Sequence, residues 1–218
     1  MKQIIIACCA ASFLFACNDE KRGATTDGIN STATTTSATA KNDDWVPVDS
    51  ATAMRTMMEA GTPGAQHAML AKGDGNWTAE TTIWMSPDTA PMTTKSNVVN
   101  KMVLGGRYQE TTFKGDMMGM PFEGSSTTGY DNAKKVYFTT WMDNMSTGMM
   151  NMEGTWDEAS KSISFKGTML CPANGQECEM REVYKIVDDN THVMEMYGLD
   201  VKTGKEYKNM EIKFVRKK

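Results

Sequence analysis

Short runs of strand-forming residues alternate with turn-forming residues from Asn76 to the end of the chain, with a turn about every ten residues. The runs lie at residues 76–85, 93–103, 107–115, 121–130, 135–143, 147–156, 162–170, 178–187, 191–199 and 206–216. Connections this short force neighbouring strands to be antiparallel, because a parallel return needs a dozen or more residues. An antiparallel meander exposes two edges unless it closes on itself. The pattern therefore predicts an all-β fold, an antiparallel up-and-down β-barrel of about ten strands over residues 76–218.

Hydrophobic alternation supports strands that each bury one face. In the run 162–170, Ile163, Phe165 and Met169 share one face, whereas Ser164 lies on the other. We therefore expect alternate residues of each strand to point into the barrel.

Residues at the two ends of the predicted barrel indicate a specific class. Gly75-Asn76-Trp77 opens the first strand just after a short helical stretch, and Arg216 closes the last strand. This arrangement resembles that of calycin (lipocalin-like) barrels, in which the tryptophan of a Gly-x-Trp pattern packs under a basic side chain from the final strand. The resemblance implies a barrel floor plugged by Trp77 and Arg216.

The stretch before the first strand, residues 45–75, favours one or two short helices. Asp49 can cap a helix in which three methionines form an apolar stripe. A second helical turn is expected at 67–71. These pieces are too short to form a bundle, so we expect them to act as a lid or plug on the barrel.

The first residues have the layout of a bacterial export signal. A single positive charge at Lys2 precedes an apolar segment, residues 4–15, which is too short to span a bilayer. The segment is followed by a sequence, LFAC, that resembles the lipobox, in which the cysteine becomes the acylated first residue of a lipoprotein. We therefore expect a signal peptide at 1–16 and lipidation of Cys17.

Residues 17–44 contain mostly Thr, Ser, Ala, Gly, Asn and Asp, so we expect a disordered tether after the acylated cysteine. The expected location is the bacterial cell envelope, with the anchor in the outer membrane and the domain on the periplasmic side or the cell surface. The membrane is thus an expected partner. A net charge of −4 argues against nucleic acid as a partner, since a phosphate-binding surface needs clustered Lys and Arg.

Two of the five cysteines, Cys171 and Cys178, lie within the predicted barrel. They flank a loop containing Asn174-Gly175, a strong hairpin-turn pair, so the two sulfurs could meet across the neck of that loop. An exported compartment permits a disulfide, which we predict here. A metal site is the alternative, but the chain has no second cysteine pair at metal-ligand spacing and only two histidines.

Residues 114–152 combine strand and turn signals with a high density of methionine. Within this stretch, the strings MMGMPFEG, GYDN and TGMM resemble those of a bacterial family known as domain of unknown function 1579. That family has no established activity, so the resemblance implies no particular reaction, cofactor or substrate.

The chain contains 21 methionines. Met150 and Met152 alternate with polar Asn151, as inward-facing strand residues do, and methionine fills irregular apolar space. We therefore expect Met118, Met142, Met150 and Met152 to line the barrel interior and to contact a small apolar or amphipathic ligand. Copper binding is the alternative, because soft thioethers suit Cu(I).

The run 178–187 adds polar groups to this interior. Strand parity places Glu182 and Tyr184 on the same face as Met180, so we include the carboxylate and the phenol among the ligand contacts. The alternative for Glu182 is a position near a barrel end, hydrated or paired. His192 begins the next run, and a haem-ligand role is a further alternative for this histidine.

No nucleophile elbow, Gly-rich phosphate loop, HExxH sequence or paired CxxC occurs in the chain, so we expect neither enzymatic activity nor a bound cofactor. An enzymatic role would need Glu182, Tyr184 and His192 to converge in the lumen. The favoured function is ligand binding by an envelope lipoprotein. The alternative is a structural or interaction lipoprotein that uses its outer face and binds no ligand.

Overall fold

A computed structural model describes residues 45–172 and 174–218. The expected signal peptide at 1–16, the lipidation site Cys17 and the expected tether at 17–44 lie outside the described residues. Across the part that is described, no helix combines the length and the apolar character that a membrane crossing requires.

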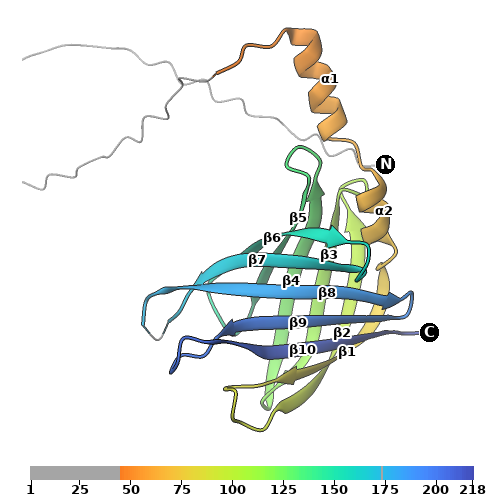
Figure 1. Ribbon diagram of the computed structural model, residues 1–218. Helices are drawn as coiled ribbons and strands as arrows, with labels where there is room; N and C mark the ends of the chain where they lie inside the picture. The colour runs from red at the N-terminus through yellow and green to blue at the C-terminus, as the bar shows by residue number, and fades with distance from the viewer. Residues whose placement is uncertain (1–44, 173) are drawn as a thin grey trace, which may run out of the picture. The chain divides into compact units, whose positions relative to one another are not determined.

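Two short helices precede ten strands (Figure 1). The helices are α1 (Ser50–Ala60) and α2 (Ala65–Ala71). The strands are β1 (Gly75–Ile83), β2 (Met92–Val103), β3 (Tyr108–Met117), β4 (Met120–Asp131), β5 (Val136–Asp143), β6 (Met150–Asp157), β7 (Ser162–Leu170), β8 (Glu177–Asp188), β9 (Thr191–Leu199) and β10 (Glu206–Arg216). As expected, Asp49 caps α1, because its Oδ1 accepts hydrogen bonds from the backbone N–H groups of Ala51 and Thr52.

The strands form a closed barrel in which each strand pairs with its neighbours in the sequence and β1 pairs with β10. Every pairing is antiparallel, so the predicted up-and-down β-barrel is confirmed. In Figure 1, β2–β5 run steeply across β6–β10. One end of the barrel carries α2, whereas the opposite end, formed by the β1–β2, β3–β4, β5–β6, β7–β8 and β9–β10 connections, is called the open end below.

The observed strands match the predicted runs closely, and the largest difference is at the start of β6. The pattern predicts a strand from residue 147, but β6 begins at Met150. The reason is a local turn, in which Asp143 Oδ1 accepts hydrogen bonds from the N–H groups of Met145 and Ser146, at 3.0 and 3.1 Å. A side chain that turns the backbone competes with strand pairing.

The predicted floor of the barrel is present. Trp77 and Arg216 are direct neighbours in the β1–β10 register, and the Arg216 guanidinium carbon lies 4.2 Å from the centre of the Trp77 ring. Trp77 is fully buried, and its indole N–H donates to the carbonyl oxygen of Gly73. Arg216 donates to the carbonyl oxygens of Lys72 and Asp189. The floor therefore joins the first strand, the last strand and the segment that follows α2.

Two clusters of buried apolar side chains occupy the interior. The first comprises Trp77, Ala79, Val98, Phe113, Phe122, Ile212 and Phe214, and the second comprises Leu70, Tyr137, Met152, Ile163, Phe165 and Met180. The partly buried Tyr184 packs against both clusters. Because Leu70 belongs to α2, the second cluster ties that helix to the barrel.

Gly154 permits a close approach between β6 and β7. A Cβ atom added at Gly154 would lie 2.5 Å from the backbone oxygen of Ser164, which no side-chain rotation can relieve. For Gly148, in the β5–β6 loop, no atom of the described residues lies within 4 Å of the same position. The two glycines thus form a matched pair for testing the packing between these strands.

We expect Gly154→Ala to lower the free energy of unfolding by about 1–3 kcal/mol, because the backbone of β7 must move away. Gly148→Ala should change it by no more than about 0.5 kcal/mol. Chemical denaturation of both variants measures the difference. Equal stability of the two variants would contradict the register assigned to β6 and β7.

Candidate functional site

Glu182 is the most unusual side chain inside the barrel. It lies within β8, directly opposite Phe165 on β7 and Met196 on β9, and it is 7% exposed. Its neighbour Arg181 points to the outer face, where it forms an ion pair with Glu206 and stacks 3.6 Å from the centre of the Tyr197 ring. The predicted orientation, with Glu182 facing into the barrel and Arg181 facing out, is therefore confirmed. Arg181 does not neutralise the carboxyl of Glu182.

Burial raises the pKa of Glu182 to about 7, and no hydrogen bond from the described residues lowers it. An ionised carboxylate in apolar surroundings is costly unless a partner supplies hydrogen bonds or positive charge. Near neutral pH, the Glu182 carboxyl is therefore protonated in a part of the molecules, where it can donate a hydrogen bond, and negatively charged in the rest. Such a carboxyl suits a ligand that brings its own donor.

Tyr184 and His192 form a polar pair near Glu182. Tyr184 Oη lies 2.6 Å from His192 Nδ1, and the His192 ring packs at 4.6 Å between centroids against Trp77. Burial, helped by the nearby Arg216 charge, lowers the pKa of His192 to about 4. Burial and the proximity of Glu182 raise the pKa of Tyr184 above its usual value. The imidazole is thus neutral and the phenol protonated at physiological pH.

A set of hydroxyl groups points inward from β4 and β5. Thr139 is buried, and its Oγ1 lies 3.1 Å from both Ser126 Oγ and Thr128 Oγ1. The sequence did not single out these residues, because the strings SSTT and TT place hydroxyl residues at consecutive positions, with no apolar residue to indicate which of them face inward. The register assigns them to the interior, since Thr139 pairs with the buried Met152.

Part of the barrel interior is accessible to solvent. Several inward-facing side chains remain half-buried, and these are Ser126, Thr128, Trp141, Met150, Tyr184, Met194 and Met196. At the end that carries α2, by contrast, the cavity beside Tyr184 and His192 has a volume of only about 40 Å³. That volume holds about one water molecule. This cavity is therefore too small for a larger molecule.

The methionines predicted to line the interior divide into two groups. Met150 and Met152 face inward, and Met152 is 2% exposed. Met118 and Met142 are 57% and 46% exposed, so the expectation that they line the interior was wrong. Met118 lies in the tight β3–β4 turn, and Met142 lies on the opposite face of β5 from the inward-facing Thr139.

Other methionines are exposed as well, and many of them lie at or near the open end. The exposed methionines are Met54, Met57, Met58, Met85, Met92, Met118, Met120, Met142, Met145, Met149 and Met169. Those of the β3–β4 and β5–β6 connections are held side by side, because Asn144 Nδ2 donates to the carbonyl oxygen of Pro121 at 2.9 Å. The methionine density of residues 114–152 is therefore only partly a feature of the lumen.

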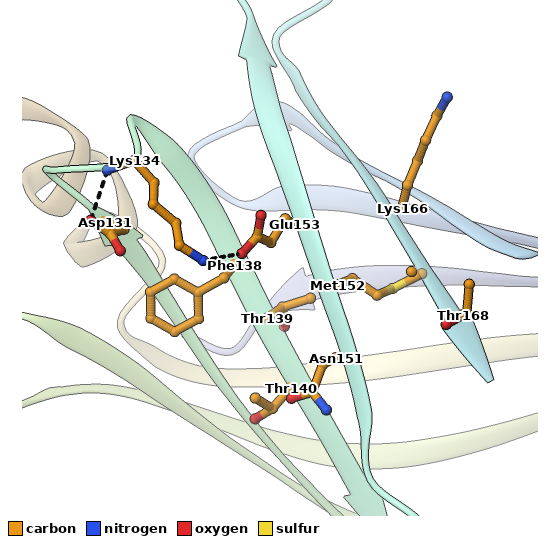
Figure 2. Close-up of a pocket in the computed structure, with 11 residues that line it drawn as sticks. Asp131, Lys134, Phe138, Thr139, Thr140, Asn151, Met152, Glu153, Lys166 and Thr168 are labelled. Carbon is orange, nitrogen blue, oxygen red and sulfur yellow. Dashed lines mark hydrogen bonds and ion pairs between the residues drawn. The ribbon is translucent and has the colours of Figure 1, made fainter. Parts of the chain in front are cut away.

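A hollow on the outer surface of β5, β6 and β7 has a volume of about 540 Å³ (Figure 2). Its outward-facing lining includes Phe138, Thr140 and Lys166, together with an ion pair between Lys134 and Glu153 at 2.7 Å. These charged groups are exposed and the ion pair is already formed. Among the described residues, the groove therefore has no buried carboxyl comparable to Glu182.

The two cysteines of the β7–β8 hairpin are free thiols in this structure, so the predicted disulfide is not formed. Both are partly buried. Burial and the neighbouring Cys171 side chain, in that order, raise the pKa of Cys178. The described residues contain no group of three or more His, Cys, Asp or Glu side chains arranged to hold a metal ion.

Comparison with known proteins identifies a family and a fold. The family model described as "Protein of unknown function (DUF1579)" matches residues 62–216. No curated protein matches the sequence. The crystal structure of Rv2717c from M. tuberculosis is similar, with a TM-score of 0.52 and 13% identity over 72% of this chain and 100% of that chain. At this identity, the similarity shows the fold alone.

A second solved structure, a redesigned β-barrel, also matches 72% of this chain and 100% of its own. Its identity is 10% and its TM-score is 0.36.

The pKa of Glu182 gives a testable dependence of stability on pH. Between the ordinary value of 4.5 and the folded value of about 7, the folded chain binds more protons than the unfolded chain. Stability therefore falls as the pH rises through this interval and then levels off. Since one pKa unit corresponds to about 1.4 kcal/mol, the full loss is about 3 kcal/mol.

We expect Glu182→Gln to be more stable than the wild type at pH 8, by up to about 3 kcal/mol, and similar to it at pH 4. Glu179→Gln, at an exposed position on the outer face of the same strand, is the control and should show no such difference. Denaturant titrations at both pH values measure the effect. A gain that is the same at pH 4 and pH 8 would rule out an ionised, unpaired Glu182.

Proposed function

The chain belongs to the family described as protein of unknown function (DUF1579), and we propose that it is a lipid-anchored envelope protein that binds a small amphipathic molecule in its barrel. The observation that carries this proposal is the buried carboxyl of Glu182, which has no partner among the described residues. A buried carboxyl without a partner weakens the fold, and a ligand that supplies the missing donor offsets this cost.

The side chains inside the barrel indicate which class of ligand would bind. Met180 and Met196 beside Glu182 offer flexible apolar contacts, and methionine side chains adapt to ligands of different shapes. Across the strands, the hydroxyl groups around Thr139 can accept or donate further hydrogen bonds. The best match is a molecule with an apolar body and one polar group that donates hydrogen bonds or carries positive charge.

The N-terminal sequence supports the location. The LFAC sequence that ends at Cys17 supports acylation at that residue, and several acyl chains would hold the barrel durably at a membrane surface. The open end of the barrel would then receive ligands from the envelope rather than from the cytoplasm.

A second function, an interaction lipoprotein that uses its outer face, is favoured by the exposed methionines of the open end. Met120, Met145 and Met149 are 45%, 44% and 54% exposed on adjacent connections. Apolar side chains gathered on a surface commonly mark a protein contact. In the first function, a small molecule contacts side chains inside the barrel. In the second, a partner protein contacts the exposed methionines of the open end.

Ligand binding can be tested with two amphiphiles of opposite charge, dodecylamine and dodecanoate, added to the detergent-solubilised full chain at pH 8. We expect dodecylamine to bind more tightly, because Glu182 is ionised at that pH. Quenching of tryptophan fluorescence reports binding, since Trp141 packs against the interior cluster.

Glu182→Gln should weaken dodecylamine binding by roughly 10-fold to 100-fold, because a hydrogen bond to a charged group contributes about 1.5–3 kcal/mol. Glu179→Gln should bind as the wild type does. Failure of both amphiphiles to bind, together with native mass spectra showing only the bare protein, would exclude the lumen and leave the interaction role.

The anchor is tested separately by growing expressing cells with an alkyne-labelled palmitate. We expect the label on the wild-type protein and none on Cys17→Ala. Cys171→Ala is the matched control and should retain the label. Labelling of Cys17→Ala would contradict lipidation at Cys17.

A further inference from the structure

Three sulfur-containing side chains lie on one face of the β7–β8 hairpin, at the open end. Met169 on β7 is directly opposite Cys178 on β8, so the two side chains share a face of the sheet. Cys171 follows two residues after Met169 and continues the pairing, because its N–H donates to the carbonyl oxygen of Gln176 at 2.8 Å. Alternation along an extended strand therefore places Cys171 on the same face as Met169.

This face is the inner one. On β7, Met169 lies on the same face as the buried Phe165, and on β8, Cys178 lies on the same face as the buried Met180. Met169 is 40% exposed, and both cysteines are partly buried. The three sulfur atoms thus lie at the mouth of the lumen, where a small ion can reach them from solvent.

The register relates the two cysteines diagonally rather than directly. Cys178 is opposite Met169, and Cys171 is opposite Gln176. Diagonal neighbours in antiparallel strands have Cα atoms about 7–8 Å apart. That separation is at or beyond the limit of about 7 Å for a disulfide. An ion between the sulfurs relaxes this limit, because it adds two metal–sulfur bonds of about 2.3 Å each, the length found in zinc thiolate sites.

The three sulfur ligands determine which metal ion would bind. Two thiolates and a thioether are soft ligands, which favour Cu(I). Structural zinc takes four ligands from Cys, His, Asp and Glu, and no group of three such side chains exists among the described residues. The nearby exposed carboxylates of Glu177 and Glu179 alternate with Cys178 and so belong to the other face.

We propose that the β7–β8 hairpin binds one Cu(I) ion through the sulfur atoms of Cys171, Cys178 and Met169. Binding replaces the two thiol protons, which are released to solvent, and changes no oxidation state. The site is separate from Glu182 and does not depend on a ligand in the lumen.

The test is an anaerobic titration of the reduced full chain with Cu(I), in competition with a chromogenic Cu(I) chelator. We expect the wild type to hold one Cu(I) per chain more than the double variant Cys171→Ser, Cys178→Ser. The remaining cysteines, Cys8, Cys9 and Cys17, are the same in both proteins, so they cancel in the comparison.

Met169→Leu keeps both thiols and the apolar volume of the side chain. It should leave the number of bound ions unchanged, weaken binding about tenfold, which equals about 1.4 kcal/mol, and remove one sulfur from the coordination shell seen by X-ray absorption. Met142→Leu is the matched control, because Met142 has a similar exposure but points to the outer face, and it should bind as the wild type does.

Equal Cu(I) binding by the wild type and the double cysteine variant would overturn the proposal. An unchanged sulfur shell in Met169→Leu would overturn the assignment of the third ligand. Cysteines that remain joined as a disulfide under the reducing conditions would also overturn it.

Discussion

The contact between Trp77 and Arg216 holds the barrel closed. These residues belong to the first and last strands, and a meander of ten strands becomes a barrel only where those two strands pair. Arg216 also donates to backbone carbonyl groups of the segment after α2, so one side chain joins both ends of the sheet to the helix. A guanidinium group over a buried indole adds cation–π attraction to the strand pairing.

This closure makes the two ends of the molecule chemically different. At the floor, Leu70, Tyr184 and His192 line a cavity of only about 40 Å³. Toward the open end, inward-facing side chains remain half-buried, and sulfur-containing residues lie at the mouth. A carboxyl with a pKa of about 7 between these regions costs stability, which natural proteins commonly accept at functional sites.

Strand parity explains why part of the site could be predicted from the sequence and part could not. The inward orientation of Glu182 and Tyr184 follows from alternation with Met180, because the period of a strand is two residues. The same reasoning failed for Met118 and Met142, since one lies in a turn and the other lies on the outer face. The hydroxyl groups around Thr139 had no apolar alternation to indicate their direction.

The sequence by itself determined the number and order of the strands and the antiparallel pairing, because turn spacing and periodicity are local properties of the chain. The two residues of the floor, Trp77 and Arg216, were expected from the resemblance to calycin barrels. Only the tertiary structure decided which side chains meet. The pairing of Cys178 with Met169 and the isolation of Glu182 both depend on register between strands. A shift of one residue moves every side chain of a strand to the opposite face, so register is fixed by the closed barrel as a whole.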